Sequence, residues 1–140
     1  MSHGNYCVLL ADRHHGLRDS VRGLLETEFD NVFMVATEAA LLEGAERLNP
    51  AVVVLELELS HGDLRGLLER ISAVAPRAKL LLMSVHDERT VSESALAAGA
   101  LAVVLKRRLD TELMLAVDAL RAGQRYLSPE FAEPPRRDLR

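Results

Sequence analysis

The sequence is short of several residue types and patterns, and each shortage argues against a class of protein. Cys7 is the one cysteine among 140 residues, so no internal disulfide can form and a reducing compartment is favoured. No stretch approaches the roughly 18 consecutive apolar residues of a membrane span, and the opening MSHGNY lacks the regions of a signal peptide. We therefore expect a cytoplasmic protein that makes no use of a membrane.

Strong charge of one sign is missing too. The formal net charge is −4, from 17 basic and 21 acidic side chains, which gives no electrostatic case for direct binding to nucleic acid or anionic lipid. The sequence contains no G-x-G-x-x-G, no G-x-x-x-x-G-K-[ST] and no G-x-S-x-G. These missing motifs argue against dinucleotide enzymes, P-loop nucleotide hydrolases and serine hydrolases.

What the sequence does have is a regular alternation of apolar runs and amphipathic stretches. The runs are nearly continuous, which is typical of strands covered on both faces. The segments between them carry apolar residues at helical spacing. Five repeats of this order predict an α/β fold, a (βα)5 doubly wound, five-stranded parallel sheet of flavodoxin-like type. The runs are YCVLLA (6–11), NVFMVAT (31–37), AVVVLEL (51–57), AKLLLMS (78–84) and ALAVVLK (100–106).

The end of the sequence has a different character. After Leu127, the segment SPEFAEPPRRDLR holds three of the five prolines and shows no apolar periodicity. Proline-rich segments without such periodicity are typical of linkers. We therefore predict one domain over residues 1–127 and a linker or tail over residues 128–140.

Polar side chains at the ends of the predicted strands form the candidate site. Ligands of open α/β sheets bind beyond the carboxyl ends of the strands, so side chains at those ends should converge. Asp12 and Arg13 follow the first strand, and Glu56 ends the third. Ser84 follows the fourth strand and Lys106 the fifth.

At this point the sequence resembles a known family. The stretches VLLADRHHGLRDSVRGLLE, AVVVLELELSHGD, KLLLMSVHDE, AGALAVVLK and AVDALRAGQRYLSPE are similar, in this order, to the receiver domain of NarL/LuxR-type response regulators. The resemblance covers nearly all of residues 6–130. It implies a phosphoryl-accepting aspartate at the end of the third strand and two Mg²⁺-binding acids after the first. It also implies a Ser or Thr and a Lys that contact the phosphoryl group, which Ser84 and Lys106 match.

Three positions depart from the family pattern. Glu56 stands at the phosphorylation-site equivalent, Arg13 replaces the second metal-binding acid, and Val103 occupies the usually aromatic switch position. Asp12 and Glu56 balance Arg13 and Lys106 to a formal charge of zero, whereas three acids and one lysine leave −2 for a divalent cation. Mg²⁺ also prefers oxygen ligands. We therefore predict no metal and no other cofactor, with Mg²⁺ binding lost or weak and Asp12 its only residual ligand.

In this interpretation two side chains take the place of the metal ion and the phosphorylated aspartate of an active receiver. Arg13 substitutes for the cation, and Glu56 partly imitates a phosphorylated aspartate, with less charge and fewer acceptor oxygens. Simpler alternatives remain open at each position. Glu56 could be a solvated acid bridged to a neighbouring cation, and Arg13 could point away. Ser84 could bond locally, and Lys106 could be an ordinary surface lysine.

Histidines at the same edge of the sheet allow a further hypothesis. They lie in loops near the two acids and could bind a soft divalent metal or sense pH. Loop histidines are common, so an ordinary structural role stays open. The four are His14, His15, His61 and His86.

The leading functional hypothesis is a signalling domain without enzymatic activity. It would belong to a two-component transcriptional response regulator, act independently of phosphorylation and control a DNA-binding output domain absent from this chain. Regulation would come from a small ligand, a partner protein or homodimerisation through the Asp87–Ala122 face, which could equally be a solvated surface. This face carries Arg107, Arg108, Glu112 and Arg121.

Two alternative functions stay open. The first is a working, metal-dependent receiver that is phosphorylated on Glu56 or Asp63. Asp63 lies seven residues beyond the predicted strand end, which is poor geometry for this role. The second is a small-ligand-binding module that uses the same pocket.

Overall fold

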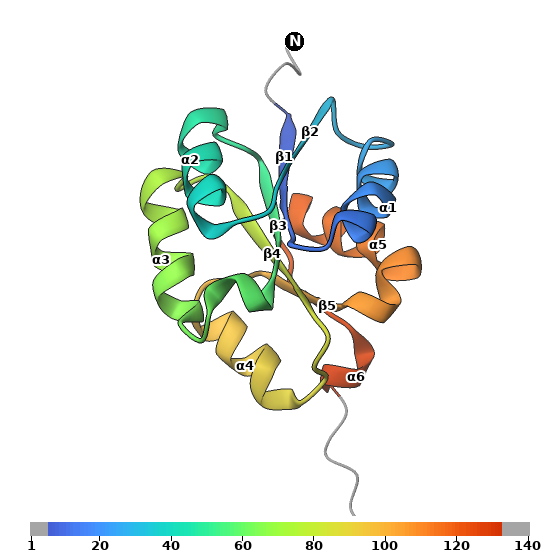
Figure 1. Ribbon diagram of the computed structural model, residues 1–140. Helices are drawn as coiled ribbons and strands as arrows, with labels where there is room; N and C mark the ends of the chain where they lie inside the picture. The colour runs from blue at the N-terminus through green and yellow to red at the C-terminus, as the bar shows by residue number, and fades with distance from the viewer. Residues whose placement is uncertain (1–5, 133–140) are drawn as a thin grey trace, which may run out of the picture.

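The computed structural model describes residues 6–132 and is built around a parallel six-stranded sheet (Figure 1). The strand order is β2-β1-β3-β4-β5-β6, so the order reverses between β1 and β3. The strands are β1 (Cys7–Ala11), β2 (Asn31–Val35), β3 (Val52–Glu56), β4 (Lys79–Ser84), β5 (Ala102–Leu105) and β6 (Tyr126–Leu127). The helices are α1 (His15–Leu25), α2 (Glu38–Leu48), α3 (Leu64–Val74), α4 (Arg89–Ala97), α5 (Leu109–Arg121) and α6 (Pro129–Ala132), with 3₁₀ turns η1 (Leu57–Ser60) and η2 (Lys106–Arg108).

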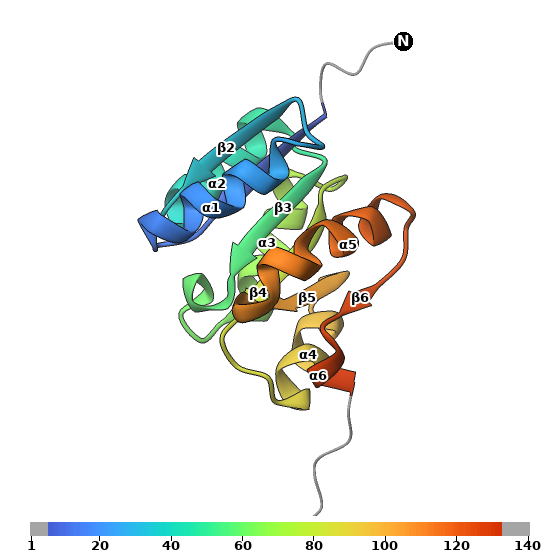
Figure 2. The same cartoon turned by 90° about the vertical axis from the view of Figure 1, so that its right-hand side faces the viewer.

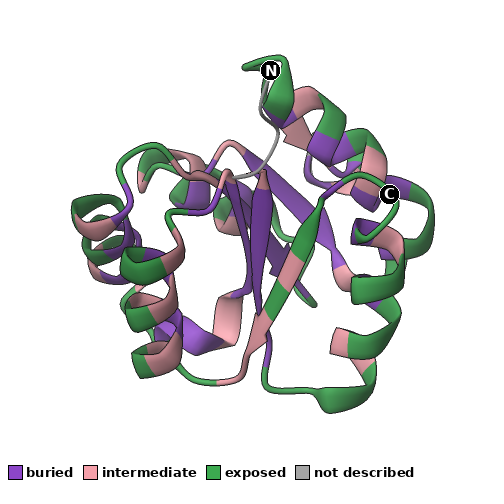
Figure 3. Ribbon diagram, turned by 90° about the horizontal axis from the view of Figure 1, so that it is seen from above, coloured by how far each residue is buried: buried purple, intermediate pink, exposed green. Residues whose placement is uncertain are grey.

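Helices cover both faces of the sheet. Helices α2, α3 and α4 lie on one face, and α1 and α5 lie on the other (Figures 1 and 2). Successive residues of β1 enter opposite cores: Leu9 joins the cluster that contains Leu41, and Leu10 joins the one that contains Leu113. This double cover explains the unbroken apolar runs, and Figure 3 shows the buried sheet between helices whose outer faces are exposed. None of the helices between residues 6 and 132 is long and apolar enough to cross a membrane.

The predicted fold class is confirmed, and the sheet has one strand more than the five predicted. Strand β6 is only two residues long and pairs in parallel with β5, with Leu127 opposite Val103. The chain then continues into α6, whose Phe131 is buried in the core under α2, α3 and α4. The predicted boundary after residue 127 stays a prediction, but residues 128–131 pack against the domain. The rest of the predicted tail, 133–140, lies outside the described residues.

A buried polar cluster joins this C-terminal segment to α5. The Ser128 hydroxyl donates to Glu112 Oε1 at 2.6 Å and accepts the Leu105 backbone N–H at 2.9 Å. Ser128 is fully buried, and only 8% of Glu112 is exposed. Burial and the nearby Glu112 carboxylate raise the pKa of the Tyr126 phenol to about 12. The C-terminal segment is therefore part of the packed domain at β5.

This arrangement corrects the prediction for the Asp87–Ala122 face. Glu112 was expected on an exposed interaction surface, but it is buried and bonded to Ser128. Strand β6 pairs with the open edge of β5, and Glu130 on α6 forms an ion pair with Arg108. The chain itself therefore covers the β5 part of the predicted face.

We expect Ser128→Ala to lower the free energy of unfolding by about 1–3 kcal/mol, the usual cost of leaving buried polar groups without a partner. The substitution removes the hydroxyl that serves both Glu112 and the Leu105 N–H. Urea denaturation at neutral pH measures the change. Ser72→Ala is the control, because Ser72 is exposed on α3 and should change stability by less than about 0.5 kcal/mol. Equal effects of the two substitutions would contradict a structural role for the cluster.

Candidate functional site

The candidate site lies at the carboxyl edge of the sheet, where the sequence predicted it. Glu56 is the last residue of β3, Asp12 directly follows β1, and Lys106 directly follows β5. Parallel pairing brings these strand ends to one edge. The side chains of Asp12 and Glu56 are fully buried, and that of Lys106 is only 11% exposed. The site is therefore a compact charged pocket with little solvent around its acids.

Both carboxylate oxygens of Glu56 are engaged by cationic residues. Oε2 accepts the Arg13 backbone N–H at 2.6 Å and the Arg13 Nε–H at 3.0 Å, while Oε1 accepts a hydrogen bond from Lys106 Nζ at 2.9 Å. The alternative in which Arg13 points away is therefore wrong. The alternative of a solvated Glu56 bridged to a neighbouring cation is wrong in one part, because the side chain is buried. The bridges to cations are present.

These contacts shift the pKa values of the residues involved. Burial raises the pKa of Glu56, but hydrogen bonds from the Arg13 backbone, from Lys106 and from the Arg13 guanidinium outweigh it and hold the pKa below its usual value. Burial lowers the pKa of Lys106, but Glu56 and Asp12 together raise it above its usual value. The hydrogen bond and the charge of Glu56 raise the pKa of Arg13. All three side chains are therefore held in their charged forms.

The Lys106 ammonium occupies the centre of the pocket. Its Nζ lies 2.9 Å from Glu56 Oε1 and 3.0 Å from Asp12 Oδ2, and 3.5 Å from His14 Nδ1. The contact with Asp12 is an ion pair, and Asp12 is fully buried. The alternative that Lys106 is an ordinary surface lysine is therefore wrong. Lys106 is the cation shared by both acids, whereas Arg13 contacts Glu56 alone.

Two predicted pocket residues lie apart from this cluster. Ser84 Oγ donates to the His86 carbonyl and accepts the His86 N–H, each at 2.8 Å, so it bonds locally in the β4–α4 turn. The alternative that Ser84 forms only local hydrogen bonds therefore matches the structure. Val103 is fully buried in the middle of β5, in the core under α2, α3 and α4. The structure therefore brings together Asp12, Arg13, Glu56 and Lys106 but leaves out Ser84 and Val103.

The Mg²⁺ ion that the family resemblance implies does not fit these residues. Asp12, His14 and Glu56 can each offer a ligand atom, and these atoms lie within 4.8 Å of one another. Lys106 Nζ already contacts all three residues, and Arg13 Nε occupies the other oxygen of Glu56. Two like unit charges about 4 Å apart repel by about 4 kcal/mol at an effective dielectric of about 20. A divalent ion would therefore have to displace the ammonium before it could bind.

Among the four histidines, only His14 belongs to this pocket. Its backbone N–H donates to Asp12 Oδ1 at 2.7 Å, and its Nδ1 lies 3.1 Å from the same oxygen. The position two residues after an aspartate in a turn is a signal for this contact, because Asp side chains commonly accept from that N–H. His86 instead lies 3.8 Å from Glu58, and His15 lies 3.9 Å from Asp19.

Comparisons with known proteins show the family of this chain. The family model of the response regulator receiver domain matches residues 8–118. The chain is 27% identical over 124 residues to the transcriptional regulatory protein MctR of Rhizobium johnstonii, covering 86% of this chain and 58% of that protein. It is 29% identical over 125 residues to the oxygen regulatory protein NreC of Staphylococcus epidermidis, covering 86% and 56%. The chain thus spans less than two thirds of these curated relatives.

Solved structures show the same fold. A LuxR-family two-component response regulator from Aurantimonas sp. is 26% identical, with a TM-score of 0.80 over 90% of this chain and 91% of that one. The isolated REC domain of RcsB from Salmonella enterica serovar Typhimurium is 23% identical, with a TM-score of 0.76 over 91% and 96%. The second likeness concerns the fold alone.

Proposed function

This chain belongs to the response regulator receiver domain family, with LuxR-type relatives, and we propose that it signals without being phosphorylated. The supporting observation is the state of Glu56, whose two oxygens accept hydrogen bonds from Arg13 and Lys106 while its side chain is fully buried. Phosphoryl transfer needs a positioned nucleophile and cations that neutralise the developing charge. A carboxylate with both oxygens occupied, beside a site that does not fit Mg²⁺, meets neither requirement. We therefore infer that the domain does not catalyse its own phosphorylation.

Charge balance supports the same proposal. Asp12 and Glu56 contribute −2, and Arg13 and Lys106 contribute +2, so the pocket is neutral without a metal ion. The contact of Lys106 with Glu56 replaces the contact that the family lysine makes with a phosphoryl group. Glu56 carries less charge and fewer acceptor oxygens than a phosphorylated aspartate, and Ser84 stays bonded to His86. The proposed state is therefore a partial imitation of the phosphorylated one.

If the Glu56 pocket is not phosphorylated, another signal has to regulate the domain. The relative MctR is a transcriptional regulatory protein and is longer than this chain. We propose that the domain controls a DNA-binding output domain, and that dimerisation, a small ligand or a partner protein sets its state. The homodimer would use the parts of the Asp87–Ala122 face that β6 and α6 leave uncovered, namely the outer sides of α4 and α5. Leu115 on α5 is one apolar residue there, 56% exposed.

The test is a ¹⁵N-HSQC titration with Mg²⁺ and then beryllofluoride, together with incubation with acetyl phosphate. We expect no saturable shift of the Asp12, Arg13, Glu56 and Lys106 amides at millimolar Mg²⁺ and no phosphorylated product by mass spectrometry, because Lys106 holds the position of the cation. Saturable shifts that grow with beryllofluoride would instead identify a working receiver. Phosphorylation of Asp63 would identify the other open alternative.

A further inference from the structure

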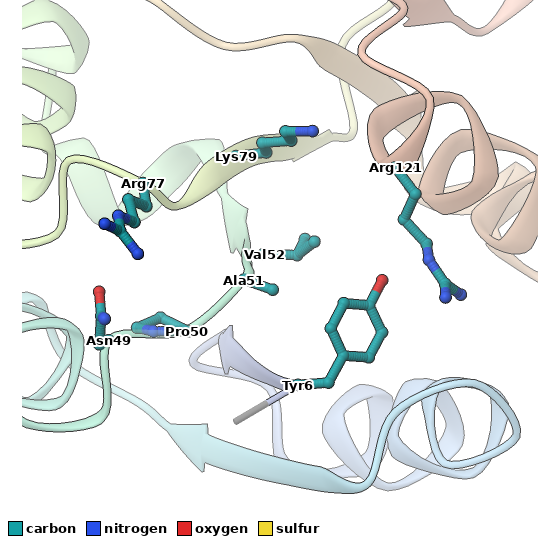
Figure 4. Close-up of a pocket in the computed structure, with 8 residues that line it drawn as sticks. All are labelled: Tyr6, Asn49, Pro50, Ala51, Val52, Arg77, Lys79 and Arg121. Atoms are coloured by element: carbon teal, nitrogen blue, oxygen red, sulfur yellow. The ribbon is translucent and has the colours of Figure 1, made fainter. Parts of the chain in front are cut away.

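A basic cleft lies at the edge of the sheet opposite Glu56. It has a volume of about 430 Å³ and is formed where β1, β3 and β4 begin. Arg77, Lys79 and Arg121 surround it on separate sides, with Tyr6 and Asn49 completing the wall (Figure 4). Three cations therefore surround one hollow in a chain whose net charge is −4.

Most hydrogen-bond donors of these side chains have no partner among residues 6–132. Lys79 Nζ donates once, to the Leu120 carbonyl at 2.9 Å, although an ammonium has three hydrogens. Arg121 Nη1 donates to Glu28 at 2.8 Å, and Arg77 has no ion-pair partner in this part of the chain. The Tyr6 hydroxyl is buried and likewise has no partner within those residues. The three lining cations and Glu28, the acid paired with Arg121, sum to a formal charge of +2.

Favourable contacts with helix C-termini explain only part of why cations lie around this cleft. Helices α2, α3 and α5 end at this edge, and a helix C-terminus carries roughly half a negative charge that favours nearby cations. The contact of Lys79 with the Leu120 carbonyl is of this kind. It uses one hydrogen of one side chain, and no described carbonyl accepts from the Arg77 guanidinium. If the cations only balanced the negative helix C-termini, no hollow would be needed between them.

We propose that this cleft binds a small anion with at least two negative charges, either a phosphate ester or a polycarboxylate. Two negative charges match the excess of +2, and the volume lies in the range of roughly 300–1,000 Å³ that is typical of small-molecule sites. Both faces of the Tyr6 ring are taken, by Phe29 with ring centroids 4.8 Å apart and by Arg121 at 4.6 Å. Recognition therefore rests on charge and hydrogen bonds, not on stacking of a base.

This site is separate from the Glu56 pocket. Tyr6 precedes β1 and Asp12 follows it, and the five residues between them span about 17 Å in an extended strand. An anion in the cleft therefore makes no contact with the Glu56 pocket, and the proposal does not rest on the proposed absence of phosphorylation.

The test is a ¹⁵N-HSQC titration of the full chain with pyrophosphate and, separately, with citrate. We expect saturable shifts at the Tyr6, Arg77, Lys79 and Arg121 amides, with none at Glu56. Arg77→Gln should weaken binding at least about tenfold, because it removes a charge-assisted donor pair, and its melting temperature should stay unchanged because Arg77 is exposed. The control Arg65→Gln replaces an exposed arginine on α3 outside the cleft and should change affinity by less than about twofold.

The two anions separate the possible ligand classes. Binding of pyrophosphate alone supports a phosphate ester, and binding of citrate alone supports a polycarboxylate. Saturation by neither anion would overturn the proposal. Equal weakening by Arg77→Gln and Arg65→Gln would also overturn it, because the attraction would then be general to the surface.

Discussion

Replacing Lys106 with methionine is expected to lower the free energy of unfolding by about 3–5 kcal/mol, the range found when one partner of a buried ion pair is removed. The Lys106 ammonium lies 2.9 Å from Glu56 and 3.0 Å from Asp12, and both acids are fully buried. Methionine keeps most of the apolar stem but leaves two buried carboxylates without their shared cation. Arg13 remains, but its side chain is 46% exposed and contacts Glu56 alone. Urea denaturation at about pH 7 measures the loss.

The effect of the ion pairs should depend on pH in a defined direction. The pKa of Glu56 is lowered in the folded state, so its contribution is full above its ordinary value of 4.5 and is lost as pH falls through the folded value. The pKa of Lys106 is raised, so its contribution is full below 10.5 and is lost as pH rises through the folded value. The wild-type contribution is therefore flat between these limits. The deficit of Lys106→Met should shrink at low pH, where Glu56, no longer paired with Lys106, takes up a proton.

Two controls separate charge from packing. Arg107→Met changes the next residue, whose ion pairs with Asp87 and, at 3.9 Å, with Glu130 should together contribute less than about 1 kcal/mol because Arg107 is exposed. The double variant Lys106→Met/Glu56→Gln removes one carboxylate charge together with the cation and should recover part of the loss, which a double-mutant cycle quantifies. A loss from Lys106→Met no larger than that from Arg107→Met would contradict the central role of Lys106.

The sequence predicted the layers of the fold well because periodicity carries that information. Nearly continuous apolar runs identified β1, β3, β4 and β5, which are buried on both faces, and a weaker run identified the partly exposed edge strand β2. A strand of two residues has too few positions to show a period, so β6 was missed. The burial of Glu112 did have a signal: it lies three residues after Leu109 and four before Ala116, both of which face the core.

The sequence predicted which residues form the site better than it predicted how their side chains are arranged. Strand ends place Asp12, Glu56 and Lys106 at one edge whatever their rotamers, so their convergence follows from topology. Which cation lies between the acids depends on side-chain conformations, and the sequence alone favoured Arg13 where the structure places Lys106. The orientation of Ser84 was equally open, because its reciprocal bonds with His86 depend on the local turn.

The prediction that bears most directly on function is a gain of Mg²⁺ binding and of phosphorylation in a double variant. The double substitution Arg13→Asp/Glu56→Asp introduces the residue types that the resemblance to receiver domains implies at these two positions. The pocket charge, with Asp12 and Lys106 unchanged, becomes −2 instead of zero. We expect Mg²⁺ affinity to rise at least about a hundredfold, because a cation near the metal position is replaced by an oxygen ligand. Phosphorylation by acetyl phosphate should appear in parallel, since the metal and an acceptor of normal length are both present.

Stability supplies an independent readout of the same variant. Without metal it should melt below wild type, because the Arg13–Glu56 contacts are gone and three acids share one lysine. Mg²⁺ should raise its melting temperature by mass action and leave the wild type unchanged. Arg65→Asp/Glu56→Asp is the matched control, since it changes the net charge of the chain equally and keeps Arg13. Equal Mg²⁺ affinity in the control would show that Arg13 does not exclude the metal. Equal affinity in the wild type would refute signalling without phosphorylation, because the native pocket would then hold the ion that phosphoryl transfer requires.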